Sequence, residues 1–163
     1  MDAATGLVWG VKTSWVSYIT RMSDGVVSTS GGAKRLDTGE FHFPLASIDE
    51  DGARFVGAVR FSGHFGMLDV NFGEFAVTCT EGIVDLSVAD DDPDSIGGRR
   101  TVLVLEEPTD EAGIVSFARP LLTARGADLF FDNYRPGTRF DRVAIPARAL
   151  PAAGRVLTSL SES

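Results

Sequence analysis

The amino-acid sequence predicts a mainly β domain: an antiparallel β-sandwich or barrel-like sheet with an N-terminal α-helix. Short segments rich in β-branched and aromatic residues follow one another after residue 25, and Gly, Asp or Pro separates them. Strong helical periodicity is confined to the N-terminus. With 163 residues and 44% hydrophobic content, the chain can bury one core, so we expect a single domain over residues 1–163.

The first segment, residues 5–25, has the apolar spacing of an amphipathic helix. We expect Thr5 to be its N-cap and Ser23-Asp24-Gly25 to end it. Gly10 lowers the helix propensity of the segment by about 1 kcal/mol. The apolar side chains that recur at steps of three or four residues are Leu7, Val8, Val11, Trp15, Ile19 and Met22.

The middle of the chain predicts strands in series. Residues 25–45 read as two strands with a glycine-rich break, and in the second of them Phe41 and Phe43 alternate with Glu40 and His42. The pair Asp51-Gly52 is typical of a hairpin turn. With the later segments we expect about six or seven strands. Those segments are 54–66, 67–80, 82–90 and 101–108.

The last third of the chain predicts a second helix and one more strand. Residues 90–100, "DDDPDSIGGRR", read as an acidic, solvated loop. A short helix is expected near 120–131, followed by a turn and a strand in "FDRVAIPA". We expect residues 147–163 to form a C-terminal tail.

Composition excludes several classes of function. The net charge of −8 argues against a nucleic-acid partner, because an acidic protein gains nothing from counterion release. The single cysteine, Cys79, excludes an intrachain disulfide and reads as a small core residue. No run of 18 apolar residues and no secretory leader is present, so we expect a cytosolic chain or the mature form of an exported one.

Motifs for common catalytic sites are also absent. The chain has no G-x-S-x-G nucleophile elbow and no P-loop. His42 and His64 are the only histidines, too few for a zinc site without carboxylate partners, and no spacing indicates such partners. His64, in "SGHFG", is therefore either a packing residue or part of another kind of site.

The first helix carries two polar side chains on one side. Ser14 and Tyr18 are four residues apart, so they lie one turn from each other beside the apolar stripe. A tyrosine in this position either packs with its hydroxyl directed toward water or a carbonyl, or takes part in a site.

Four segments together resemble the haem-transport-associated HtaA domain family. They are "LVWGVKTSWVSYI", "GGAKRLDTGEFHFPL", "VGAVRFSGHFGMLDV" and "LTARGADLFFDNYRPGTRFDRVAIP", and they span residues 7–146 in the family's order. The chain departs from the family pattern at Trp15, where the family usually has Phe, and in "NFGEFAV", where a proline is usual.

The resemblance implies a mostly β fold that binds ferric haem b through a tyrosine. The matching residue is Tyr18, which would be the iron ligand, and the supporting serine matches Ser14. His64 matches the histidine that hydrogen-bonds the ligating tyrosine. Trp15 and Phe65 are expected to pack on the macrocycle, and further candidates for this role are Trp9, Phe61 and Met22.

The chemistry of a phenol agrees with this assignment. A phenol is protonated at neutral pH, but ferric iron is a Lewis acid that can displace the proton. A hydrogen bond from His64 would stabilise and orient the phenolate, and tyrosine ligation is an established haem mode. The cations available for the propionates are Lys12, Arg21, Lys34 and Arg60.

The resemblance also implies other haem-transfer proteins as partners, and it leaves homodimerisation open. Family members are usually exported or held at the cell surface, whereas the chain as given shows neither leader nor anchor. Two other functions therefore stay open. One is a small-molecule enzyme of the cyclase or isomerase type, with Tyr18 and His64 as an acid/base pair. The other is a ligand-binding or interaction domain without haem.

Overall fold

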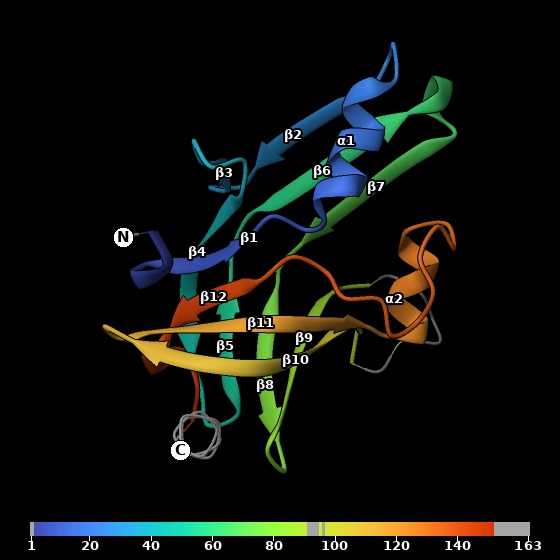
Figure 1. The fold of residues 1–163 in the computed structure, drawn as a ribbon. Helices are drawn as coiled ribbons and strands as arrows, with labels where there is room; N and C mark the ends of the chain where they lie inside the picture. The colour runs from blue at the N-terminus through green and yellow to red at the C-terminus, as the bar shows by residue number, and fades with distance from the viewer. Residues whose placement is uncertain (1, 91–94, 96, 152–163) are drawn as a thin grey trace.

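Eight antiparallel strands close into a barrel-like sheet in the computed structural model, which describes residues 2–90, 95 and 97–151 (Figure 1). The predicted mainly β, barrel-like class is thereby confirmed. The ring closes because the first strand pairs with both the last strand and the fourth. In order, its strands are β1 (Gly6–Trp9), β12 (Val143–Pro146), β11 (Ile114–Leu122), β10 (Arg99–Glu111), β9 (Ile83–Ala89), β8 (Ala76–Thr80), β5 (Gly52–Phe55) and β4 (Phe41–Ile48).

A second, three-stranded sheet extends from the barrel and carries the first helix. Its order is β2 (Val26–Ser30), β6 (Ala58–Gly63) and β7 (Leu68–Gly73). Helix α1 (Thr13–Arg21) lies against this sheet, and α2 (Ala124–Leu129) lies at the end of the barrel nearest to it (Figure 1). The remaining elements are β3 (Lys34–Arg35), which pairs with β4, and three short turns of 3₁₀ helix: η1 (Asp2–Ala4), η2 (His64–Gly66) and η3 (Ala147–Ala149).

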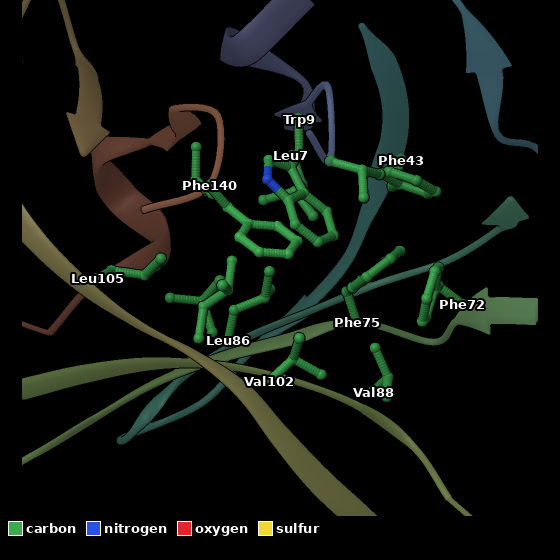
Figure 2. Close-up of a cluster of buried hydrophobic side chains, with 14 of the residues drawn as sticks. Leu7, Trp9, Phe43, Phe72, Phe75, Leu86, Val88, Val102, Leu105 and Phe140 are labelled. Atoms are coloured by element: carbon green, nitrogen blue, oxygen red, sulfur yellow. The ribbon is translucent and has the colours of Figure 1, made fainter. Parts of the chain in front are cut away.

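Large aromatic and aliphatic side chains fill the barrel. Figure 2 shows Trp9 of β1, Phe75 and Phe140 among the side chains that converge there, and all three are buried. The Trp9 indole also donates to the carbonyl oxygen of Asp141 at 3.2 Å, so it joins the core to the segment before β12. Cys79 is buried in the same core, as predicted.

The N-terminal helix begins later than the sequence indicated. Residues 6–9 form β1, and α1 starts at Thr13, so the predicted N-cap at Thr5 and the helical assignment of Leu7 and Val8 are wrong. All four β1 residues are buried, and such a run has no alternation that separates a strand from a helix. Val11 then adopts a left-handed φ of 63°, which separates strand from helix.

The strand series is longer than expected, and the second helix is shorter. The described residues form twelve strands, whereas the sequence predicted six or seven in the middle of the chain and one more near its end, and the prediction missed β11 entirely. Helix α2 occupies Ala124–Leu129 of the predicted 120–131, because residues 120–122 complete β11. Thr123 caps the helix by accepting the backbone N–H of Gly126 at 2.9 Å.

Two predicted segments lie partly outside the described residues. Of the acidic loop 90–100, residues 91–94 and 96 are not described. Of the predicted tail 147–163, the described residues 147–151 include Ala149 and Leu150, both buried in the core. Within the described residues, neither helix combines the length and the apolar character needed to cross a membrane.

His42 is a buried histidine on β4 with one unpartnered ring nitrogen. It is 6% exposed, and its Nε2 lies 3.0 Å from Thr5 Oγ1. Because the Thr5 hydroxyl donates to the carbonyl oxygen of Asp2, its oxygen is left to accept the His42 Nε2–H, and Nδ1 has no partner among the described residues. Burial, and then the charge of Lys34, lower the pKa of His42, while Asp2 acts in the opposite direction.

We expect the free energy of unfolding to fall as the pH drops below about 6.5, since the unfolded chain then binds a proton that folded His42 does not. The loss continues down to the lowered pKa of the folded state. His42→Gln keeps a donor for Thr5 but does not titrate, so its pH dependence should be flatter. Urea unfolding at a series of pH values from about 5 to 8 measures this difference. If the free energy of unfolding depends on pH equally in both proteins, His42 is not the source of this pH dependence.

Candidate functional site

Helix α1 places a tyrosine at the protein surface beside a buried tryptophan. Trp15 and Ile19 are fully buried and fix the helix against the three-stranded sheet. Tyr18 follows Trp15 by three residues, its ring centroid 5.9 Å from that of the indole, and it remains 40% exposed. The helix therefore supplies both an anchor in the core and a phenol on the surface.

The Tyr18 hydroxyl forms a hydrogen bond with His64. The Tyr18 Oη to His64 Nε2 distance is 2.8 Å, and the two ring centroids are 5.9 Å apart. His64 follows the last residue of β6 and reaches the helix from the adjacent hairpin. The structure thus brings together two residues that the resemblance assigned to one site, 46 positions apart in the chain.

The turn that carries His64 has a strained backbone. His64, Phe65 and Gly66 have φ values of 50°, 56° and 86°, so three consecutive residues are left-handed. This conformation costs a residue other than glycine about 1–2 kcal/mol. The turn therefore persists only because neighbouring contacts hold it.

Trp15 forms the inner wall of the site. Its ring packs on Phe61 and Phe130, with centroids 6.0 Å and 5.1 Å away. Its indole N–H is buried and has no hydrogen-bond partner among the described residues. An unpartnered buried donor is uncommon in a folded protein, and this one lies next to the Tyr18 ring.

Ser14 is not bonded to Tyr18 but to a second tyrosine. The Ser14 Oγ lies 2.7 Å from the Tyr134 hydroxyl. Tyr134 follows α2, and its ring also lies 5.7 Å from the Lys12 ammonium. Tyr134 lies in a segment that resembles the family, but no sequence pattern indicated a role for it. In the structure Tyr134 is one of the residues that join the start of α1 to the segment after α2.

Three large apolar side chains near these elements are exposed. Phe65 and Met67, in and just after the strained turn, are 93% and 86% exposed, and Phe131 after α2 is 50% exposed. Of the other residues predicted to contact a ligand, Trp9 and Phe61 are buried in the core and Met22 is half-buried against it. Phe65 is therefore available to a ligand, whereas Trp9 and Phe61 are packing residues.

The four candidate cations are in different surroundings. Lys12 donates to the carbonyl oxygen of Arg139, and Arg60 forms an ion pair with Asp69 on the three-stranded sheet. Lys34 lies on β3, where it is the backbone partner of His42 on β4. Arg21 lies in the last turn of α1, three residues after Tyr18, and within the described residues it has no ion-pair partner. Of the four, Arg21 is the one that follows Tyr18 on the same helix, within one turn of it.

A separate groove of about 520 Å³ lies on the barrel surface, and it contains none of the predicted site residues. Its apolar part includes Val8, Leu36 and Ile114, and its charged residues include Glu111 and Arg142. It has no tyrosine, histidine or cysteine. Within the described part of the chain, no group of three or more His, Cys, Asp or Glu side chains could hold a metal ion. The Tyr18–His64 pair is thus better suited to ligand chemistry than this groove.

A model of the HtaA family matches residues 4–146. The C-terminal domain of HtaA from Corynebacterium glutamicum is 26% identical, with a TM-score of 0.59 over 86% of this chain and 94% of that chain. The heme binding protein HtaB from the same organism is 20% identical, with a TM-score of 0.64 over 87% of this chain and 91% of that chain.

A domain-swapped dimer, the H434A variant of the C-terminal domain of HtaA, is also similar, at 27% identity and a TM-score of 0.54 over 84% of this chain and 91% of that one. Among curated proteins, no significant match was found. The family match runs from η1 to β12 and includes the barrel, the three-stranded sheet and both helices. The chain therefore belongs to the HtaA family.

Proposed function

We propose that this protein binds ferric haem b, with the phenol oxygen of Tyr18 as the ligand to iron. The observation that carries the proposal is an exposed tyrosine whose hydroxyl lies 2.8 Å from His64 Nε2. Membership of the HtaA family supports it, and so does the similarity to a protein described as the heme binding protein HtaB.

The chemistry of the donor pair fits this ligand. A phenolate oxygen is a hard, anionic donor, which favours ferric over ferrous iron, and tyrosine is an established axial ligand of haem. Bound haem would supply the Lewis-acidic iron. His64 can accept the hydroxyl proton through Nε2 or donate an N–H to the phenolate, and either bond fixes the direction of the oxygen.

The surroundings of Tyr18 suit a large apolar ring. Trp15 provides a buried wall, and Phe65, Met67 and Phe131 provide exposed apolar surface that a macrocycle could cover. Arg21, within one turn of Tyr18 on the same helix, would pair with a propionate. A single protein ligand on an exposed surface also suits a carrier that takes haem from one protein and passes it to another.

A hemin titration of the purified apo-protein tests the proposal directly. We expect a saturable Soret band at about one haem per chain, with charge-transfer bands of a ferric phenolate. Light scattering in the same titration reports whether the loaded protein is a monomer or a dimer. Absorbance that rises without saturation, or a spectrum without phenolate bands, would contradict the assignment.

His64→Ala should weaken haem binding less than loss of the ligand itself. The phenol remains but loses its hydrogen-bond partner, and removal of such a partner costs roughly 10–100-fold in metal affinity. The charge-transfer bands should also shift, because the electron density on the oxygen changes. Unchanged affinity and an unchanged spectrum would show that His64 does not act on Tyr18 in the loaded protein.

A further inference from the structure

The loop after α1 and the turn after β6 meet at one end of the three-stranded sheet. Val26 pairs with Ser62, and two residues beyond that pair, on either strand, lie Asp24 and His64. Asp24 Oδ2 accepts the backbone N–H of Phe65 at 2.7 Å. We infer that Asp24 is a positioning residue that holds His64 against Tyr18, an inference that rests on the proposed function of this pair.

The backbone around Asp24 is fixed by hydrogen bonds and by a close approach to α1. The N–H of Met22 bonds to the carbonyl oxygen of Ile19, and the N–H of Gly25 bonds to that of Met22, both at 3.1 Å. A Cβ atom on Gly25 would stand 1.8 Å from the carbonyl oxygen of Ile19, so only glycine fits there. The chain thus leaves α1 by one tight path, and this path fixes where the Asp24 backbone lies relative to Tyr18.

The turn that contains His64 requires a stabilising contact of this kind. His64 and Phe65 are both left-handed, a conformation that residues other than glycine leave readily. His64 is exposed, and among the described residues its ring is hydrogen-bonded to Tyr18 alone. A carboxylate that accepts an N–H forms a charge-assisted bond, among the stronger hydrogen bonds in proteins. The Asp24–Phe65 bond therefore favours the backbone conformation that directs His64 toward the helix.

A second contact at the same place agrees with this role. Gly63 lies so close to Met22 that a Cβ atom there would stand 2.4 Å from the Met22 sulfur. Two ligand-independent contacts, Met22–Gly63 and Asp24–Phe65, thus flank the approach of the turn to α1. The Tyr18–His64 bond lies between the same parts of the chain, and the two other contacts favour its geometry.

The test compares Asp24→Ala with Asp24→Asn and with a matched control. Asp24→Ala removes the acceptor, whereas Asp24→Asn keeps an acceptor oxygen and loses the charge. Asp49→Ala is the control, because Asp49 also accepts backbone N–H groups in a hairpin turn, those of Asp51 and Gly52, but in the β4–β5 connection outside the three-stranded sheet. Each variant is measured without haem by NMR and with haem by titration.

In the apo-protein, Asp24→Ala should move the Phe65 amide resonance and the His64 ring ¹⁵N resonances toward those of a solvated turn, while Asp49→Ala should leave both unchanged. Haem affinity should fall roughly tenfold in Asp24→Ala and less in Asp24→Asn. In a His64→Ala background, Asp24→Ala should cost no further affinity, because Asp24 acts through His64.

Two results would overturn the inference. One is that the two His64 ring ¹⁵N resonances of Asp24→Ala are the same as those of the wild-type protein. The other is a loss of affinity from Asp24→Ala that is the same with and without His64, which would indicate a general effect on the fold. If the wild-type protein binds no haem, the proposed function fails, and the measurements on the apo-protein still decide whether Asp24 positions His64.

Discussion

Tyr18→Phe is expected to weaken ferric haem binding more than any other single substitution in this chain. The substitution keeps the ring that packs beside Trp15 and removes only the oxygen that would bind iron. Loss of a hydrogen-bond partner of a ligand costs roughly 10–100-fold, and loss of the sole protein ligand should cost more. The measurement is a hemin titration followed by absorption, in which the phenolate charge-transfer bands should also disappear.

Tyr134→Phe is the matched control, since Tyr134 is the only other tyrosine in the chain. Its hydroxyl bonds Ser14 at 2.7 Å, so the substitution removes a comparable hydrogen bond one helical turn from Tyr18. The phenolate bands should persist in this variant. If the bands persist in Tyr18→Phe and vanish in Tyr134→Phe, the iron ligand is Tyr134 and not Tyr18.

Local patterns were sufficient for most of the fold class. Alternation in segments such as β6 and β7 reflects a sheet with one buried and one exposed face, so Phe61 and Val70 point inward while Arg60 and Asp69 point outward. The pair Asp51-Gly52 marked the β4–β5 connection correctly. These features depend only on near neighbours in the sequence, which is why they could be predicted.

The wrong secondary-structure predictions occur where a strand is buried on both faces, so that its residues do not alternate, or where a strand contains a proline. Strand β1 is buried on both faces, so it shows no alternation, and Leu7 and Val8 fitted a helical stripe as well as a strand. Strand β11 contains Pro120 opposite Leu105, and a proline inside a segment argues against a strand. In both cases partners distant in the chain, not local preference, decide the structure.

In the candidate site, too, local features could be predicted from the sequence, whereas contacts between distant segments could not. The spacing of Ser14 and Tyr18 on one side of a helix followed from the sequence, and their roles came from the resemblance to the family. The contacts of Asp24 with Phe65 and of Ser14 with Tyr134 join segments 41 and 120 positions apart. No local pattern marks such pairs: Asp24 read as the end of a helix, and Tyr134 as part of a turn.

Phe130→Ala is expected to cause the largest loss of stability among the substitutions considered. Phe130 is fully buried just after α2, and its ring packs on Trp15 of α1, Phe72 of β7 and Phe140 before β12, with centroids 5.1, 5.1 and 4.9 Å away. Truncation of a buried phenylalanine typically costs about 3–5 kcal/mol. Urea unfolding at neutral pH measures the change in the free energy of unfolding.

The adjacent Phe131→Ala provides the control, because the same atoms are removed from a side chain that is 50% exposed. Its cost in stability should stay below about 1 kcal/mol. Equal costs for the two variants would contradict the view that one aromatic side chain joins α1, the three-stranded sheet and the barrel. A large difference would support it, and it would also explain why Trp15, and with it Tyr18, keeps a fixed position at a surface where the side chains around the phenol are exposed.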